Sequence, residues 1–118
     1  MDNLTTGTPK KSTIHDQLLI MSGIVDSLTE AGVRIIIAEA TSNRKPNILI
    51  SQHYDNGRHA CLRRWAAENE IDLIVEPMEK DYKTGLNWEI HTEVNGVWIH
   101  GYLTDEEKEE YDRETLGD

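Results

Sequence analysis

The sequence from residue 88 to residue 102 reads WEIHTEVNGVWIHGY, and this stretch predicts a β-hairpin. Asn95 and Gly96 lie between two runs in which apolar and polar residues alternate. A two-residue type I′ turn needs a positive φ angle at both turn positions, and Asn-Gly meets that need at low steric cost. Because the turn sets the register, His91 is expected to face His100 across the two strands.

The two faces of this hairpin differ in chemistry. Counting outward from the turn places His91 and His100 in a non-hydrogen-bonded pair, where Cα atoms approach to about 4.5 Å and side chains touch. The apolar face is expected to join the core and consists of Trp88, Ile90, Thr92, Val94, Val97, Ile99, Gly101 and Leu103. The other face is polar and aromatic and consists of Glu89, His91, Glu93, Trp98, His100 and Tyr102.

Capping patterns mark the start of two helices. Thr104 is expected to begin the last helix, with Glu107 completing a capping box. Thr13 and Asp16 form a similar pair before the first helix, which Gly32 is expected to end. Apolar residues recur at spacings of three and four along that first helix, which is typical of an amphipathic helix: Ile14, Leu18, Ile20, Met21, Ile24, Val25 and Leu28.

The remaining predicted elements are three strands and one helix. Strands over 33–40 and 47–53 are expected to pair across a basic loop, 41–46. A helix over 58–69 and a short strand over 71–76, ended by Pro77, precede the hairpin. The order α-β-β-α-β-β-β-α predicts an α+β fold, with a mostly antiparallel sheet of about five strands and helices on one face.

Length and composition predict one small intracellular domain. With 118 residues, the chain has the usual size of a single domain. Residues 1–12 are expected to be a flexible tail and residues 13–118 the domain. Cys61 is the only cysteine, which excludes a disulfide within the chain and fits a reducing compartment. No apolar stretch is long enough to span a membrane or resembles a secretory signal, so we expect a cytoplasmic protein without membrane contact.

Negative charge is concentrated at the C-terminal end. The net charge is −10, and residues 104–118 hold 8 acidic and 2 basic residues. Such a field repels nucleic-acid phosphates and attracts basic surfaces, so direct nucleic-acid binding is not expected. The run is either a solvated face or a docking surface that mimics nucleic-acid phosphates in the basic groove of a partner. The carboxylates predicted to dock are Glu106, Glu107, Glu109, Glu110 and Asp112.

Three interpretations of the polar hairpin face remain open. It is the solvated side of an antiparallel sheet, a partner-binding surface with Trp98 and Tyr102 as anchors, or a metal or acid/base site built on His91 and His100. The usual spacings of metal ligands are missing from the sequence. We therefore assign no catalytic residue, metal or cofactor.

Two further candidates are interpreted as structural. The polar run 53–59 lies at a strand-to-helix junction but lacks a phosphate-binding glycine pattern, which favours a turn and helix cap over an anion site. Cys61 shares the apolar side of its predicted helix with Leu62 and Trp65, which favours a buried structural thiol over a nucleophile.

Residues 28–35, LTEAGVRI, and 44–50, RKPNILI, carry a resemblance. The segment 24–52 resembles a helix-plus-hairpin found in short phage- and prophage-encoded proteins, and the stretch 88–101 is similar in style. The resemblance covers about half of the chain. It implies an accessory protein of a mobile element, many of which bind and block a host protein, and it carries over no functional residues.

The leading hypothesis is a non-enzymatic acidic binding protein. It would act as an inhibitor, immunity factor or anti-defence factor that blocks a basic partner such as a nuclease, a toxin or a nucleic-acid-binding complex. One alternative is a small dimeric acidic secretion chaperone, and another is a small metal-dependent enzyme that uses His91 and His100. The sequence leaves the identity of the partner and the oligomeric state open.

Overall fold

A computed structural model describes residues 13–41, 43–51, 58–79 and 83–116. The predicted tail, 1–12, and most of the polar run 53–59 lie outside the described residues. The element order agrees with the sequence-based prediction: α1 (Ile14–Glu30), β1 (Ile35–Thr41), β2 (Arg44–Ile50), α2 (Arg58–Glu68), β3 (Ile74–Pro77), β4 (Leu86–Val94), β5 (Val97–Thr104) and α3 (Asp105–Leu116).

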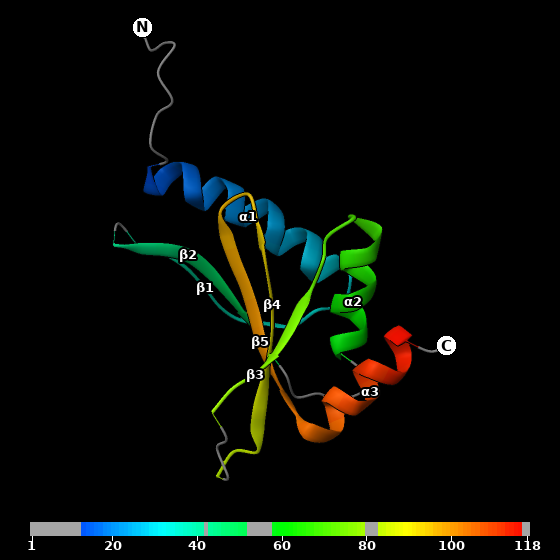
Figure 1. The fold of residues 1–118 in the computed structure, drawn as a ribbon. Coiled ribbons are helices and arrows are strands. Elements are labelled where there is room, and N and C mark those ends of the chain that lie inside the picture. The colour runs from blue at the N-terminus through cyan, green and yellow to red at the C-terminus, as the bar shows by residue number, and fades with distance from the viewer. Residues whose placement is uncertain (1–12, 42, 52–57, 80–82, 117–118) are drawn as a thin grey trace, which may run out of the picture.

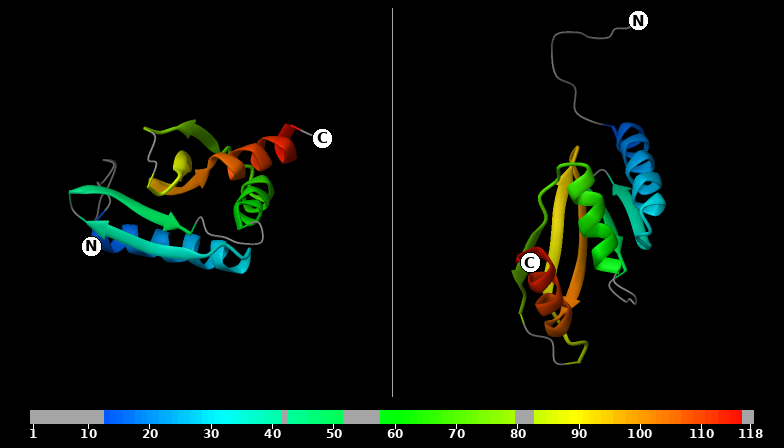
Figure 2. Two further views of the ribbon diagram at one scale, coloured as in Figure 1. Left: turned by 90° about the horizontal axis from the view of Figure 1, so that it is seen from below. Right: turned by 90° about the vertical axis from the view of Figure 1, so that its right-hand side faces the viewer.

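The five strands form one sheet in the order β1-β2-β5-β4-β3 (Figure 1). Neighbouring strands are antiparallel except for β2 and β5, which are parallel. Buried side chains from α1 and α2 pack with the inward-facing residues of the sheet, and Tyr111 of α3 packs against the same cluster. The predicted α+β fold, mostly antiparallel with helices on one face, is therefore confirmed; Figure 2 shows the twist of the sheet around these helices.

The central hairpin of β4 and β5 has the predicted turn and register. Asn95 has a φ angle of 51° and Gly96 one of 82°, as a type I′ turn requires. His91 faces His100, and Glu93 faces Trp98. The pairing also extends beyond the predicted segment, to Leu86 and Thr104, after an irregularity next to Trp88.

The first two strands are joined more tightly than predicted. Residues 41–46 were expected to form a loop, but β1 extends through Thr41 and β2 begins at Arg44. Pro46, which has no N–H to donate, lies near an irregularity between Glu39 and Thr41. A proline is tolerated at a bulge because no ladder hydrogen bond is lost there, so the strand runs through it.

The third strand is shorter than predicted and includes the proline that was expected to end it. β3 starts at Ile74, and Pro77 pairs with Trp88 as its last residue. β3 is an edge strand, where proline is tolerated. Ile71 and Leu73 precede the strand and pack against the core instead.

One hydrophobic core holds the helices on the sheet. The indole Nε1 of Trp65 donates a hydrogen bond to Ser27 Oγ at 2.7 Å, which ties α2 to α1. Both expected capping boxes are present, at Thr13 with Asp16 and at Thr104 with Glu107. The buried apolar residues are Met21, Ile24, Leu28, Val33, Ile48, Ile50, Leu62, Trp65, Ala66, Ile90, Val97, Ile99 and Leu103. Among the helices in the described ranges, none is long and apolar enough to cross a membrane.

Candidate functional site

The sheet has a face that points away from this core, which we call the open face. Side chains alternate along a strand, so the residues between the buried Ile48 and Ile50 or beside the buried Ile90 and Ile99 point outward. One row crosses all five strands, because paired residues share a face. From β1 to β3 this row is Ile37, Leu49, His100, His91 and Ile74. The adjoining residues of the open face are Glu39, Asn47, Trp98, Glu93, Tyr102, Glu89 and Glu76.

Four rings form a continuous aromatic ladder on the open face. His91 stacks on Trp98, with ring centroids 4.5 Å apart and an angle of 26° between the planes. The Trp98 and His100 centroids are 6.2 Å apart, and Tyr102 meets His100 edge-on at 5.9 Å. Such contacts fix the rings relative to one another. The ladder is therefore a rigid surface, and its side chains would lose little further conformational entropy on binding a ligand.

Carboxylates surround the ladder. Glu76 Oε2 lies 2.5 Å from His91 Nε2, and Glu89 Oε2 lies 3.8 Å from His100 Nδ1. On the other side, Lys45 Nζ pairs with Glu93 Oε1 at 2.5 Å, with both side chains about half exposed. The open face therefore combines an aromatic centre with a mostly acidic surround.

Burial shifts the pKa of two residues of the ladder, His100 and Tyr102. Burial lowers the pKa of His100, the nearby Glu89 opposes that shift, and His91 adds to it. With its pKa below the usual value of about 6.5, His100 is mostly neutral at pH 7. Burial also raises the pKa of Tyr102, and Glu89 raises it further. His100 and Tyr102 are thus mostly uncharged at neutral pH, and Glu76, Glu89 and Glu93 give the open face its negative charge.

The two histidines are not arranged as the metal hypothesis assumed. They face each other in register, but the ring of His91 stacks on Trp98 and its Nε2 contacts Glu76, whereas His100 contacts Tyr102 and Glu89. Within the described part of the chain, the ligand atoms close enough together to hold an ion belong to Glu76, Glu89 and His91, and His100 is not among them. Sequence reasoning missed Glu76, because its place opposite Glu89 depends on the pairing of β3 with β4, which no local pattern reveals.

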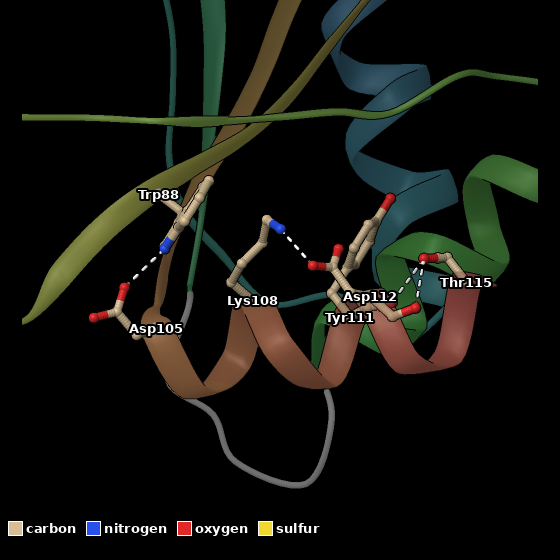
Figure 3. A network of polar contacts seen from close by, with 6 residues as sticks. All are labelled: Trp88, Asp105, Lys108, Tyr111, Asp112 and Thr115. Atoms are coloured by element: carbon tan, nitrogen blue, oxygen red, sulfur yellow. Dashed lines mark hydrogen bonds and ion pairs between the residues drawn. The ribbon is translucent and has the colours of Figure 1, made fainter. Parts of the chain in front are cut away.

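The acidic helix α3 packs back onto the inward side of the sheet (Figure 3). Trp88 Nε1 donates a hydrogen bond to Asp105 Oδ1 at 2.8 Å, and Lys108 Nζ lies 4.5 Å from the centroid of the Trp88 ring. Lys108 also pairs with Asp112, and Tyr111 packs against the core. On the neighbouring α2, Arg63 pairs with Glu114 at 2.6 Å. Lys108 and Arg63 are thus both held by contacts within the chain.

These contacts divide the predicted docking carboxylates into two kinds. Glu107 accepts the capping hydrogen bond from the Thr104 N–H, and Asp112 pairs with Lys108, so both stabilise the helix. Glu106 and Glu109 are exposed, and Glu110 is partly buried. Because α3 packs on the core side, its carboxylates and the open face form two separate surfaces at the two sides of β5.

Cys61 is half-buried rather than fully buried. It packs against the core at the α2 surface, and Arg64 Nη2 lies 3.6 Å from its sulfur. The structural interpretation of this thiol stays a prediction.

Comparison with protein-family models, with curated proteins and with solved structures finds no match to this chain. The case for function therefore depends on the open face and on α3 alone.

Proposed function

We propose that this chain is a binding protein whose open face docks onto a basic partner protein and blocks it. The observation that carries the proposal is the aromatic ladder of the open face, set among carboxylates on the side of the sheet away from the helices. A sheet face that only meets solvent is usually polar, whereas this one also places apolar side chains at its edges. Ile37 is 44% exposed and Ile74 is 51% exposed.

The aromatic residues fit the role of anchors. Tryptophan and tyrosine are enriched among the interface residues that contribute most of the binding energy. Trp98 and Tyr102 are half-buried and held in place by the histidine rings, so little of their freedom remains to be lost on binding.

Charge supports a basic partner. Glu76, Glu89 and Glu93 lie around the ladder, and the net charge of the whole chain is −10. The exposed Glu106 and Glu109 add to the field that would speed the encounter with a positive surface. Basic proteins of this kind include nucleases, toxins and nucleic-acid-binding complexes. They are the host targets that we propose for a cytoplasmic accessory protein of a phage.

The experiment is partner capture from a lysate of the native host with the tagged full chain. The wild type should retain a basic protein, and Trp98→Ala and Tyr102→Ala should each weaken its binding by about 30-fold, the loss of an interface anchor. The matched control is Leu19→Ala, which shortens an apolar side chain that is 61% exposed on α1.

Each variant is first shown by thermal denaturation to remain folded. Retained binding in both aromatic variants, or equal loss in Leu19→Ala, contradicts docking through the open face. A captured partner that is acidic contradicts the electrostatic part of the proposal.

A separate patch favours the dimeric secretion chaperone as a second candidate. Three apolar side chains of α1 are exposed, namely Ile14, Leu18 and Leu19, and Ile36 is exposed on the edge strand β1. A chaperone dimer would cover such a helix surface. Light scattering on the purified protein decides this point, because a stable monomer excludes the dimeric chaperone.

A further inference from the structure

We infer that Glu76, Glu89 and His91 form a binding site for a divalent transition-metal ion, with zinc as the ion that fits best. One ligand atom from each residue lies within 4.8 Å of the others. The inference is independent of the proposed partner, because it rests on three side chains of this chain alone.

The chemistry of the three donors suits zinc. An imidazole nitrogen and two carboxylate oxygens are ligands that Zn²⁺ accepts at about 2.0–2.2 Å, which places tetrahedral ligand atoms about 3.4 Å apart. The contact between Glu76 Oε2 and His91 Nε2 is 2.5 Å, so the two atoms would have to move apart to about 3.4 Å to bind one zinc ion. The Glu76 side chain is 54% exposed and therefore has room for this movement. Three protein ligands would leave one coordination position to solvent.

The strand pairing places the two carboxylates where a cation would stabilise them. Glu76 and Glu89 are direct partners on the antiparallel strands β3 and β4. Like charges directly opposite each other across two strands destabilise a sheet unless a positive charge offsets them. Lys45 is paired with Glu93 rather than with either of these carboxylates.

The burial and the fixed orientation of the His91 ring also support the site. The residue is only 6% exposed, and its Nε2 points at the carboxylate of Glu76. Its Nδ1 has no hydrogen-bond partner among the residues that the structure describes. The stacked ring of Trp98 fixes the imidazole, so Nε2 is held toward the carboxylates before any ion binds. His100 lies against Glu89, 3.8 Å from its Oε2, and is in place to orient that carboxylate.

A hydrogen bond from the His91 Nε2–H to the Glu76 carboxylate is the competing arrangement, since it requires no metal. Calorimetric titration of the metal-free full chain with zinc chloride distinguishes the two. We expect one zinc ion per chain, and a tetrahedral cobalt absorption spectrum when cobalt replaces zinc. His91→Ala and Glu76→Gln should each weaken zinc binding by about tenfold or more.

Two matched controls identify the site. Glu93→Gln removes a carboxylate from the same strand and face, and His15→Ala removes an exposed imidazole from α1; both should bind zinc as the wild type does. Glu76→Gln changes a mostly exposed side chain, so it tests the site even if His91→Ala fails to fold. Absence of zinc binding by the wild type, or unchanged binding by Glu76→Gln, overturns the inference. Either result leaves the partner-capture outcome unaffected, because the titration uses the isolated protein.

Discussion

Ile99→Ala is expected to lower the free energy of unfolding by about 2–5 kcal/mol, which is the usual cost of truncating a fully buried isoleucine. Ile99 lies at the centre of β5, between β2 and β4, and is 0% exposed. Its side chain therefore has core neighbours on every side, and the close packing leaves them little room to close the cavity. Urea denaturation of the wild type and the variant measures the difference.

Ile37→Ala is the matched control for that result. It removes the same atoms from an isoleucine that is 44% exposed on the edge strand β1, and it should change stability by about 0.5 kcal/mol or less. Equal losses in the two variants would contradict the assignment of Ile99 to the inward face and Ile37 to the open face.

Gly101→Val is expected to destabilise the protein by about 3 kcal/mol, at the upper end of the cost of overpacking a core. A Cβ atom at Gly101 would lie 2.7 Å from Cγ1 of Ile50. Ile50 is itself buried, and as a β-branched residue it has few alternative rotamers. The sign of the effect is informative, because strand propensity alone would favour valine over glycine.

Gly23→Ala provides the contrast, because nothing lies within 4 Å of a Cβ at that exposed helical position. That variant should gain about 0.5–1 kcal/mol from helix propensity. Thermal and urea denaturation compare the two glycine variants. A stable Gly101→Val protein would show that β5 does not approach Ile50 of β2 as closely as described.

The parts of the fold that depend on neighbouring residues were predictable from the sequence. The turn at Asn95 and Gly96 fixes the pairing of β4 with β5, and each capping box lies within four residues. The two faces of the hairpin follow from alternation alone, so the ladder residues were assigned correctly to one face.

What the sequence did not reveal depends on contacts between distant segments. The parallel pairing of β2 with β5 brings Leu49 beside His100, and the pairing of β3 with β4 brings Glu76 to His91. The acidic run was predicted as one surface, yet contacts with Trp88 and the helix cap at Thr104 engage part of it within the chain. These contacts depend on tertiary packing, and a run of like charges in the sequence does not show which of its residues will make them.

The most direct test of the proposed function is the dissociation constant of the captured partner, measured as a function of sodium chloride concentration. For the wild type, affinity should fall steeply between low and physiological salt, because ions screen the carboxylates. Trp98→Ala should weaken binding by a similar factor at every salt concentration, since its contact is short-range.

The double variant Glu39→Gln/Glu93→Gln, which removes two exposed carboxylates of the open face, should reduce the salt dependence, while the matched pair Asp26→Asn/Glu30→Gln on α1 should leave it unchanged. A partner that binds with the same affinity at all salt concentrations, and equally well to Trp98→Ala, would contradict docking of an acidic, aromatic sheet face onto a basic protein.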